Sequence, residues 1–184
     1  MSDEKFQEKY RIATTRASWH DYRCGTYFVT ICTKDKEHYF GEIADCKMFL
    51  TDIGKYANEQ FENITEHYPY AEIPLWVVMP NHIHAIVIVS DNVGDVLCNS
   101  RDVARNISTE FNEKMSKISP KRNTLSVVIR GVKSAITKFA NEYSIPFAWQ
   151  RLYYDRIIRD SDEMNHIAEY IEDNVAKWDV DEND

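Results

Sequence analysis

Two histidines lie two residues apart in the segment His82-Ile-His-Ala-Ile-Val-Ile-Val89. The segment is rich in β-branched residues and follows a Pro80-Asn81 turn signal, so we predict a strand over 82–89. Alternate residues of a strand point to the same face, which puts both imidazoles on one side of a sheet. Neutral imidazole is a common metal ligand, and two on one face can chelate an ion. A packed or exposed histidine pair is the alternative interpretation.

Tyr170 and Asn174 form a second pair with chemical potential. They are four residues apart in a segment with helical periodicity, so both lie on the same helical face. A phenol is a weak nucleophile, and it becomes useful only beside a cation or a proton acceptor. His166, one turn before Tyr170, is the nearest candidate base, and a solvent-facing histidine is its alternative. A tyrosine in the core and a polar residue near a helix end would also explain the pair.

The elements that must position these residues follow from hydrophobic periodicity. Strands are predicted over 24–33, 75–79, 82–89 and 147–158, and helices over 46–66, 124–142 and 161–177, the last capped by Asp160 and Ser161. The first six elements match the ferredoxin-like split βαβ pattern. We therefore expect an α+β fold, with an antiparallel sheet, helices on one face and a C-terminal helix that carries Tyr170.

The length of 184 residues suggests a single domain over 1–184. Residues 1–20 are polar and are interpreted as an N-terminal arm, residues 91–123 as an insertion, and residues 179–184 as an acidic tail. No apolar run approaches the roughly 18 residues of a membrane span, and no signal core opens the chain. We expect a cytoplasmic protein and no contact with membranes.

The four cysteines, Cys24, Cys32, Cys46 and Cys98, form no CxxC pair and have no histidine at zinc-finger spacing. In a chain without a signal peptide, this pattern favours reduced and mostly buried thiols.

The net charge of −8 conceals an uneven distribution along the chain. Residues 101–138 hold nine Lys or Arg against three acids, whereas residues 160–184 hold ten acids against one lysine. Such an asymmetry permits a basic binding face on an acidic protein. On the predicted helix 124–142, Arg130, Lys133 and Lys138 mostly avoid the apolar stripe and are the candidate DNA-binding residues. A solvated helix face is the alternative interpretation.

Read together, three segments resemble a known family. Residues 76–84 (Trp-Val-Val-Met-Pro-Asn-His-Ile-His), 147–159 (Phe-Ala-Trp-Gln-Arg-Leu-Tyr-Tyr-Asp-Arg-Ile-Ile-Arg) and 167–174 (Ile-Ala-Glu-Tyr-Ile-Glu-Asp-Asn) resemble the IS200-like single-tyrosine (Y1) transposases. The likeness is strongest to the REP-associated tyrosine transposases, and residues 22–33 and 127–137 share it. The resemblance spans about residues 10–178, and its most specific parts are 79–84 and 149–159.

The resemblance implies a HUH endonuclease fold and assigns the site. His82 and His84 match the metal-binding pair, Tyr170 the nucleophile and Asn174 the third metal ligand. The family cuts single-stranded DNA beside imperfect hairpins, leaves a 5′-phosphotyrosine and a free 3′-hydroxyl, and transfers strands by reversing the attack. Two imidazoles and an amide oxygen leave open positions on an octahedral ion, which favours Mg²⁺ or Mn²⁺. The expected partner is single-stranded or hairpin DNA, so the protein is expected to be associated with the nucleoid when bound to DNA. Both a monomer and a homodimer stay open.

The sequence departs from the family pattern beside the site. Val175 follows Asn174 where family members often have proline, and Arg156 stands where many have histidine. Neither change removes a core catalytic residue. Tyr153 and Tyr154 are rival nucleophiles, which we assign to packing in an aromatic strand. The expected function is thus a metal-dependent DNA endonuclease and strand transferase. A hairpin-binding protein without cleavage and a phosphodiesterase with other substrates are the alternatives.

Overall fold

The computed structural model describes residues 22–90 and 123–181, and for residues 179–181 only the backbone. The elements are β1 (Gly25–Cys32), η1 (Lys34–Lys36), β2 (Gly41–Ala44), β3 (Lys47–Leu50), α1 (Asp52–Glu62), α2 (Ile64–His67), β4 (Ala71–Val78), β5 (His82–Val89), α4 (Leu125–Glu142), β6 (Tyr154–Ile158) and α5 (Ser161–Asp181). The predicted arm 1–20, the insertion up to residue 122, Cys98 and residues 182–184 lie outside the described residues.

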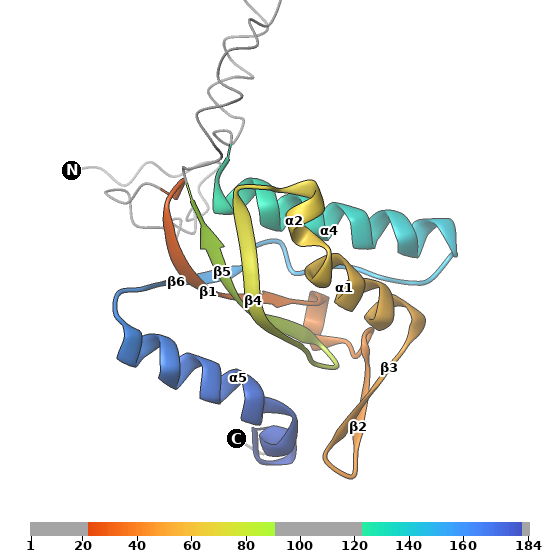
Figure 1. Cartoon of the computed structure of the whole chain (residues 1–184). Coiled ribbons are helices and arrows are strands. Elements are labelled where there is room, and N and C mark those ends of the chain that lie inside the picture. Colours follow the sequence, from red (N-terminus) through yellow and green to blue (C-terminus); the bar gives the residue numbers. More distant parts are fainter. Residues whose placement is uncertain (1–21, 91–122, 182–184) are drawn as a thin grey trace, which may run out of the picture.

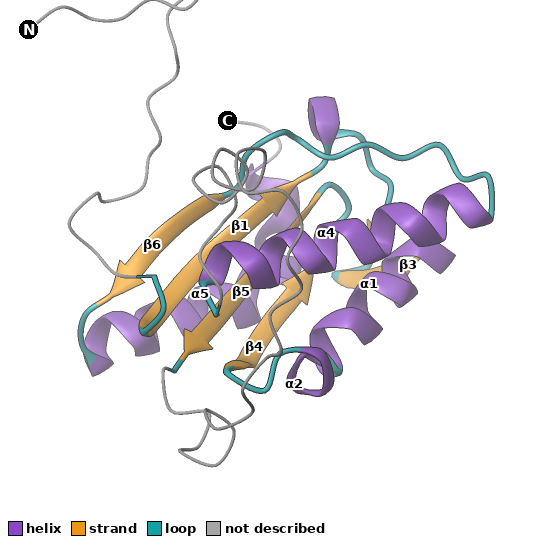
Figure 2. Ribbon diagram, turned by 90° about the horizontal axis from the view of Figure 1, so that it is seen from above, coloured by secondary structure: helices purple, strands orange, loops and turns teal. Residues whose placement is uncertain are grey.

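The main sheet has four antiparallel strands in the order β4-β5-β1-β6. This is the strand order of a split βαβ fold, with β1 and β5 in the centre. Helices α1 and α4 lie on one face of the sheet, and α5 lies on the opposite face (Figures 1 and 2). The predicted α+β fold, with a C-terminal helix separate from the other helices, is confirmed.

Alternation along β5 divides its side chains between the two faces. Ile83, Ala85 and Val87 belong to the main core, which also contains the buried residues of α1 and α4. Ile86 belongs to a smaller core with Ile158 of β6 and with residues of α5. Since side chains two apart share a face, His82 and His84 lie on the α5 side. A slip of one residue in register would exchange the two faces, so the apolar pattern of β5 fixes the histidine positions.

The helix predicted over 46–66 begins too early. Residues 47–50 form β3, which pairs with β2 in a separate two-stranded hairpin. Its turn places Asp45 and Cys46 at φ values of 51° and 56°. Gly41 has a φ of 152°, and a Cβ there would collide with the Phe49 carbonyl. The apolar residues of β3 continue the helical spacing of α1 by chance. The helix itself starts after Thr51, which caps α1 by accepting a hydrogen bond from the Gly54 N–H at 3.2 Å.

Three other boundaries differ from the prediction. The strand predicted over 75–79 begins four residues earlier, because β4 runs from Ala71 through Pro74 to Val78. Of the strand predicted over 147–158, only 154–158 pairs along β1, and the preceding residues contribute one isolated bridge between Thr33 and Trp149. Helix α5 begins as predicted, because the Asp160 carboxylate accepts a hydrogen bond from the Glu163 N–H at 2.8 Å. It continues to Asp181, three residues into the segment interpreted as a tail.

Cys24, Cys32 and Cys46 are free thiols, as expected. The expected burial is wrong for Cys24 and Cys46, which are both exposed. Cys24 directly precedes β1, and Cys46 lies in the turn between β2 and β3. In the parts of the chain that the structure describes, no helix is both long and apolar enough to cross a membrane.

Candidate active site

The two histidines of β5 lie against each other, with ring centroids 4.5 Å apart. The His82 Nδ1 lies 2.7 Å from Oδ1 of the buried Asn81. An amide oxygen can only accept, so this Nδ1 carries the proton and Nε2 keeps its lone pair. The His84 Nδ1 lies 2.9 Å from the hydroxyl of Thr30, its cross-strand partner. Both Nδ1 atoms are thus engaged by oxygen atoms, as in histidines that bind a metal through Nε2.

His84 is held in the neutral state by its surroundings. It is buried, and Phe28 stacks on its ring at a centroid distance of 5.1 Å. Burial, with a smaller contribution from the neighbouring His82, lowers the pKa of His84 to about 3. A metal ligand must be deprotonated, so His84 is available as a ligand throughout the physiological pH range.

Tyr170 reaches the histidine pair from α5. Its hydroxyl lies 3.4 Å from the His84 Nε2, and its ring meets Phe28 edge-on at 6.1 Å. The tyrosine is 44% exposed, so a substrate can approach it from solvent. The structure therefore brings the predicted nucleophile and the predicted metal pair together within one chain.

Asn174 lies on the buried side of α5, with 4% of its surface exposed. Its neighbours along that side, Ile171 and Trp178, are also buried. Tyr170, one turn before Asn174, contacts His84, and Trp178, one turn after it, lies 5.9 Å from His82. Asn174 thus occupies the helical turn between the two residues that contact the histidines. Burying an amide costs free energy unless it gains a polar partner, which is consistent with a role as a ligand.

Several residues around the site escaped the sequence analysis. Trp178 contacts both His82 and His38, with centroid distances of 5.9 and 5.8 Å. Thr30 and Phe28 face the site because β1 pairs with β5 in a register that no local pattern reveals. Asn81, next to the histidine pair in sequence, could have been recognised as the hydrogen-bond partner of His82.

Two imidazole nitrogens on one strand could hold a divalent ion. Within residues 22–90 and 123–181 no group of three or more His, Cys, Asp or Glu side chains could hold a metal, so a third protein ligand would be a donor of another type. The predicted third ligand is the Asn174 amide oxygen. Such a set leaves positions for water and phosphate oxygen atoms, unlike a closed structural zinc site.

The predicted DNA-binding residues lie elsewhere. Arg130 and Lys138 are exposed on α4, which covers the sheet face opposite α5 (Figure 2). Lys133 is half-buried, donates to the Gln150 carbonyl at 2.8 Å and lies over the Trp149 ring, and burial lowers its pKa. Lys133 therefore anchors the segment before β6. The structure does not bring these three residues to Tyr170, and their contact with DNA stays a prediction.

The rival tyrosines differ from each other. Tyr153 is half-buried against the main core, so its assignment to packing is confirmed. Tyr154 is 54% exposed on the α5 side of β6, so the same assignment is wrong for it. His166 is exposed and lines the same cavity as Tyr170.

Comparison with known proteins extends the sequence resemblance. No protein-family model matches the chain. An uncharacterised protein of Haemophilus influenzae is 36% identical over 169 residues, which cover 91% of this chain and 89% of that protein. The chain belongs to one family with it. A second protein of that organism, named "Putative REP-associated tyrosine transposase", is 23% identical over 153 residues, or 83% of this chain and 71% of that protein.

A solved REP-associated tyrosine transposase bound to a REP hairpin superposes with a TM-score of 0.54 and 18% identity. The alignment covers 88% of this chain and 74% of the transposase. The chain has the REP-associated tyrosine transposase fold. The resemblance inferred from the histidine, tyrosine and aromatic segments is thus confirmed by the sequence and the structure comparisons.

Proposed function

We propose that this chain is a metal-dependent single-strand DNA endonuclease and strand transferase that acts at DNA hairpins. The observation that carries the proposal is the Tyr170 hydroxyl at 3.4 Å from the His84 Nε2, beside His82. The REP hairpin bound by the solved transposase supports hairpin DNA as the substrate class. Because Tyr170 and His84 come from the same chain, one copy supplies both parts of the site.

The Nε2 atoms of His82 and His84 and the amide oxygen of Asn174 would hold Mg²⁺ or Mn²⁺. When bound, such an ion supplies charge neutralisation at the scissile phosphate. The Nε2 lone pair of His84 is available because this histidine is neutral. The Nε2 lone pair of His82 is available because its proton is on Nδ1, where Asn81 accepts it.

Tyr170 performs the transfer. Its Oη attacks phosphorus, the new phosphotyrosine bond forms as the bond from phosphorus to the 3′-oxygen breaks, and the 3′-hydroxyl leaves with a proton. Phe28 packs against both Tyr170 and His84 and so fixes the nucleophile relative to the histidine pair. A pKa of about 3 makes His84 a poor proton acceptor. The phenolic proton therefore passes to solvent or to His166, which lines the same cavity.

A suicide oligonucleotide that traps the cleaved intermediate tests the proposal. The wild-type chain with Mg²⁺ or Mn²⁺ should form a covalent adduct with hairpin DNA, and EDTA or the double variant His82→Ala, His84→Ala should prevent it. Tyr143→Phe, on the far side of the sheet, is the matched control and should form the adduct normally. Hairpin binding without any adduct would favour the non-cleaving alternative, and absence of both would favour a phosphodiesterase with another substrate.

A further inference from the structure

A cavity of about 370 Å³ lies beside Tyr170, between the edge strand β6 and helix α5. Phe28, Tyr154, Asp155 and Arg156 are among the residues that line it from the sheet, and His166 and Tyr170 are among those that line it from the helix. We call this cavity the Tyr154 groove. Cavities of roughly 300 to 1,000 Å³ are typical of small-ligand sites, so the groove can hold a group that accompanies the substrate to Tyr170.

The walls of the groove are aromatic. Tyr154 is 54% exposed, and the Gln150 side-chain amide donates to its hydroxyl at 3.4 Å, which orients the ring. Phe28 and Tyr170 meet edge-on in the same groove. Exposed aromatic rings beside a nuclease site suit unpaired nucleobases, because every base has a face that can stack.

An arginine lies in the lining of the groove and is paired with a glutamate. The Arg156 side chain is 70% exposed, and its guanidinium pairs with the Glu163 carboxylate at 2.6 Å. The second oxygen of that carboxylate accepts from the Arg159 N–H at 3.0 Å, so Glu163 is itself fixed at the start of α5. A guanidinium has five N–H donors, so the tethered Arg156 retains donors for a phosphate.

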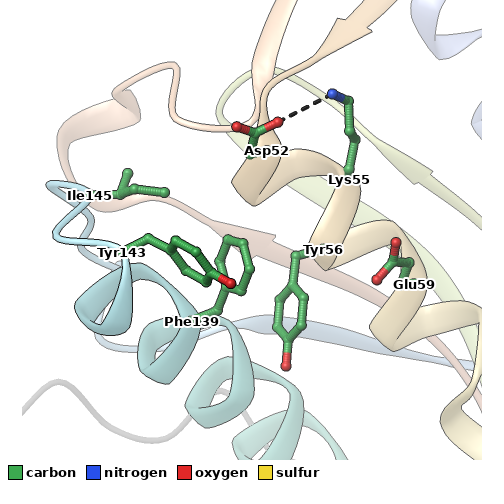
Figure 3. A pocket seen from close by; sticks show the side chains of 7 residues that line it. All are labelled: Asp52, Lys55, Tyr56, Glu59, Phe139, Tyr143 and Ile145. Atoms are coloured by element: carbon green, nitrogen blue, oxygen red, sulfur yellow. Dashed lines mark hydrogen bonds and ion pairs between the residues drawn. The ribbon is translucent and has the colours of Figure 1, made fainter.

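A larger cavity, of about 510 Å³, lies on the other side of the sheet (Figure 3). It lies between α1 and α4, and it is lined by Asp52, Lys55, Tyr56, Glu59, Phe139, Tyr143 and Ile145. Lys55 is paired with Asp52 at 3.2 Å, which leaves Glu59 as surplus negative charge. Its tyrosines resemble those of the Tyr154 groove, but it lies on the α1–α4 side of the sheet, opposite α5 and Tyr170, so it cannot hold a nucleotide next to the bond that Tyr170 cleaves.

We propose that the Tyr154 groove binds one unpaired nucleotide next to the bond that Tyr170 cleaves. Its base stacks on Tyr154, and the neighbouring phosphate contacts Arg156. The inference rests on the proposed function, and it makes Tyr154 and Arg156 substrate-positioning residues for the cleavage reaction.

Photo-crosslinking tests the groove without requiring cleavage. Single-stranded oligonucleotides that carry one 5-iododeoxyuridine are irradiated with the full chain bearing Tyr170→Phe, and tryptic peptides are identified by mass spectrometry. The crosslink should fall on Leu152–Arg156, which contains Tyr154. A crosslink on Tyr143 itself, or no crosslink on 152–156, would overturn the inference.

The affinity of the same oligonucleotides, measured by fluorescence anisotropy, gives the second readout. Tyr154→Ala should weaken binding by about 5- to 100-fold, which corresponds to the loss of one stacked base. Tyr154→Phe keeps the stacking face and should bind like the wild type, as should the control Tyr143→Ala. Equal affinity of Tyr154→Ala and the wild type would overturn the inference. The proposed function fails separately, if the wild-type chain forms no covalent adduct with hairpin DNA.

Discussion

Lowering the pH from 8 to 5 should destabilise the folded chain by about 2 kcal/mol through His84, measured in metal-free buffer. The perturbation is protonation of this histidine, which is buried under Phe28 and beside His82. Burial lowers its pKa in the folded chain from 6.5 to about 3. As the pH falls, the unfolded chain therefore binds a proton first, and stability is lost progressively from pH 6.5 towards pH 3.

The magnitude follows from these two pKa values. At pH 8 both states are deprotonated and the contribution of His84 does not vary. At pH 5 the unfolded state is almost fully protonated and the folded state is not, a difference of about 2 kcal/mol.

Urea denaturation at both pH values, with EDTA present, measures the free energy of unfolding. His84→Gln removes the titrating group, so the variant should lose about 2 kcal/mol less stability than the wild type between pH 8 and pH 5. His67→Gln, which replaces an exposed histidine at the end of α2, is the matched control. Parallel behaviour of the wild type and His84→Gln would refute the reasoning that burial keeps His84 neutral.

Three further predictions concern α5. Asn174→Leu should keep or raise the melting temperature, because leucine suits the buried side of the helix. The same variant should bind Mn²⁺ more weakly in calorimetry, and an unchanged Mn²⁺ affinity would exclude Asn174 as a ligand. Ile171→Ala leaves a cavity in the smaller core and should lower the free energy of unfolding, measured by urea denaturation, by about 2 to 5 kcal/mol. A decrease below about 1 kcal/mol would show that α5 packs loosely on the sheet. A mixture of Tyr170→Phe with the His82→Ala, His84→Ala double variant should form no adduct, since one chain supplies the whole site; restored adduct would show sites shared between subunits.

The sequence allowed much of the site to be predicted, because its key residues lie on two strongly patterned elements. His82 and His84 share a face through the period of two in β5, and Tyr170 and Asn174 share a face through the helical period of α5. The family resemblance then predicted that the histidine pair and the Tyr170–Asn174 pair form one site, and the structure places the Tyr170 hydroxyl 3.4 Å from His84. That contact depends on α5 folding across the sheet face opposite α4, which local periodicity does not encode.

The residues that the sequence analysis missed depend on long-range pairing. Thr30 and Phe28 join the site through the β1–β5 register, and Trp178 reaches His82 through the docking of α5. Periodicity predicts helix where β3 forms, because the apolar residues of β3 continue the spacing of α1. Tyr154 was assigned to packing because an aromatic run reads as a buried strand, whereas β6 is the edge of the sheet and leaves this side chain exposed.

The location of the covalent bond tests the central claim most directly. Wild-type chain is trapped on a suicide hairpin oligonucleotide with Mn²⁺, digested with trypsin and sequenced by mass spectrometry. The account predicts that the 5′-phosphate is bonded to Tyr170, in the peptide of residues 160–177, and that Tyr170→Phe forms no adduct. DNA bonded to Tyr153 or Tyr154, in the peptide of residues 152–156, would contradict it.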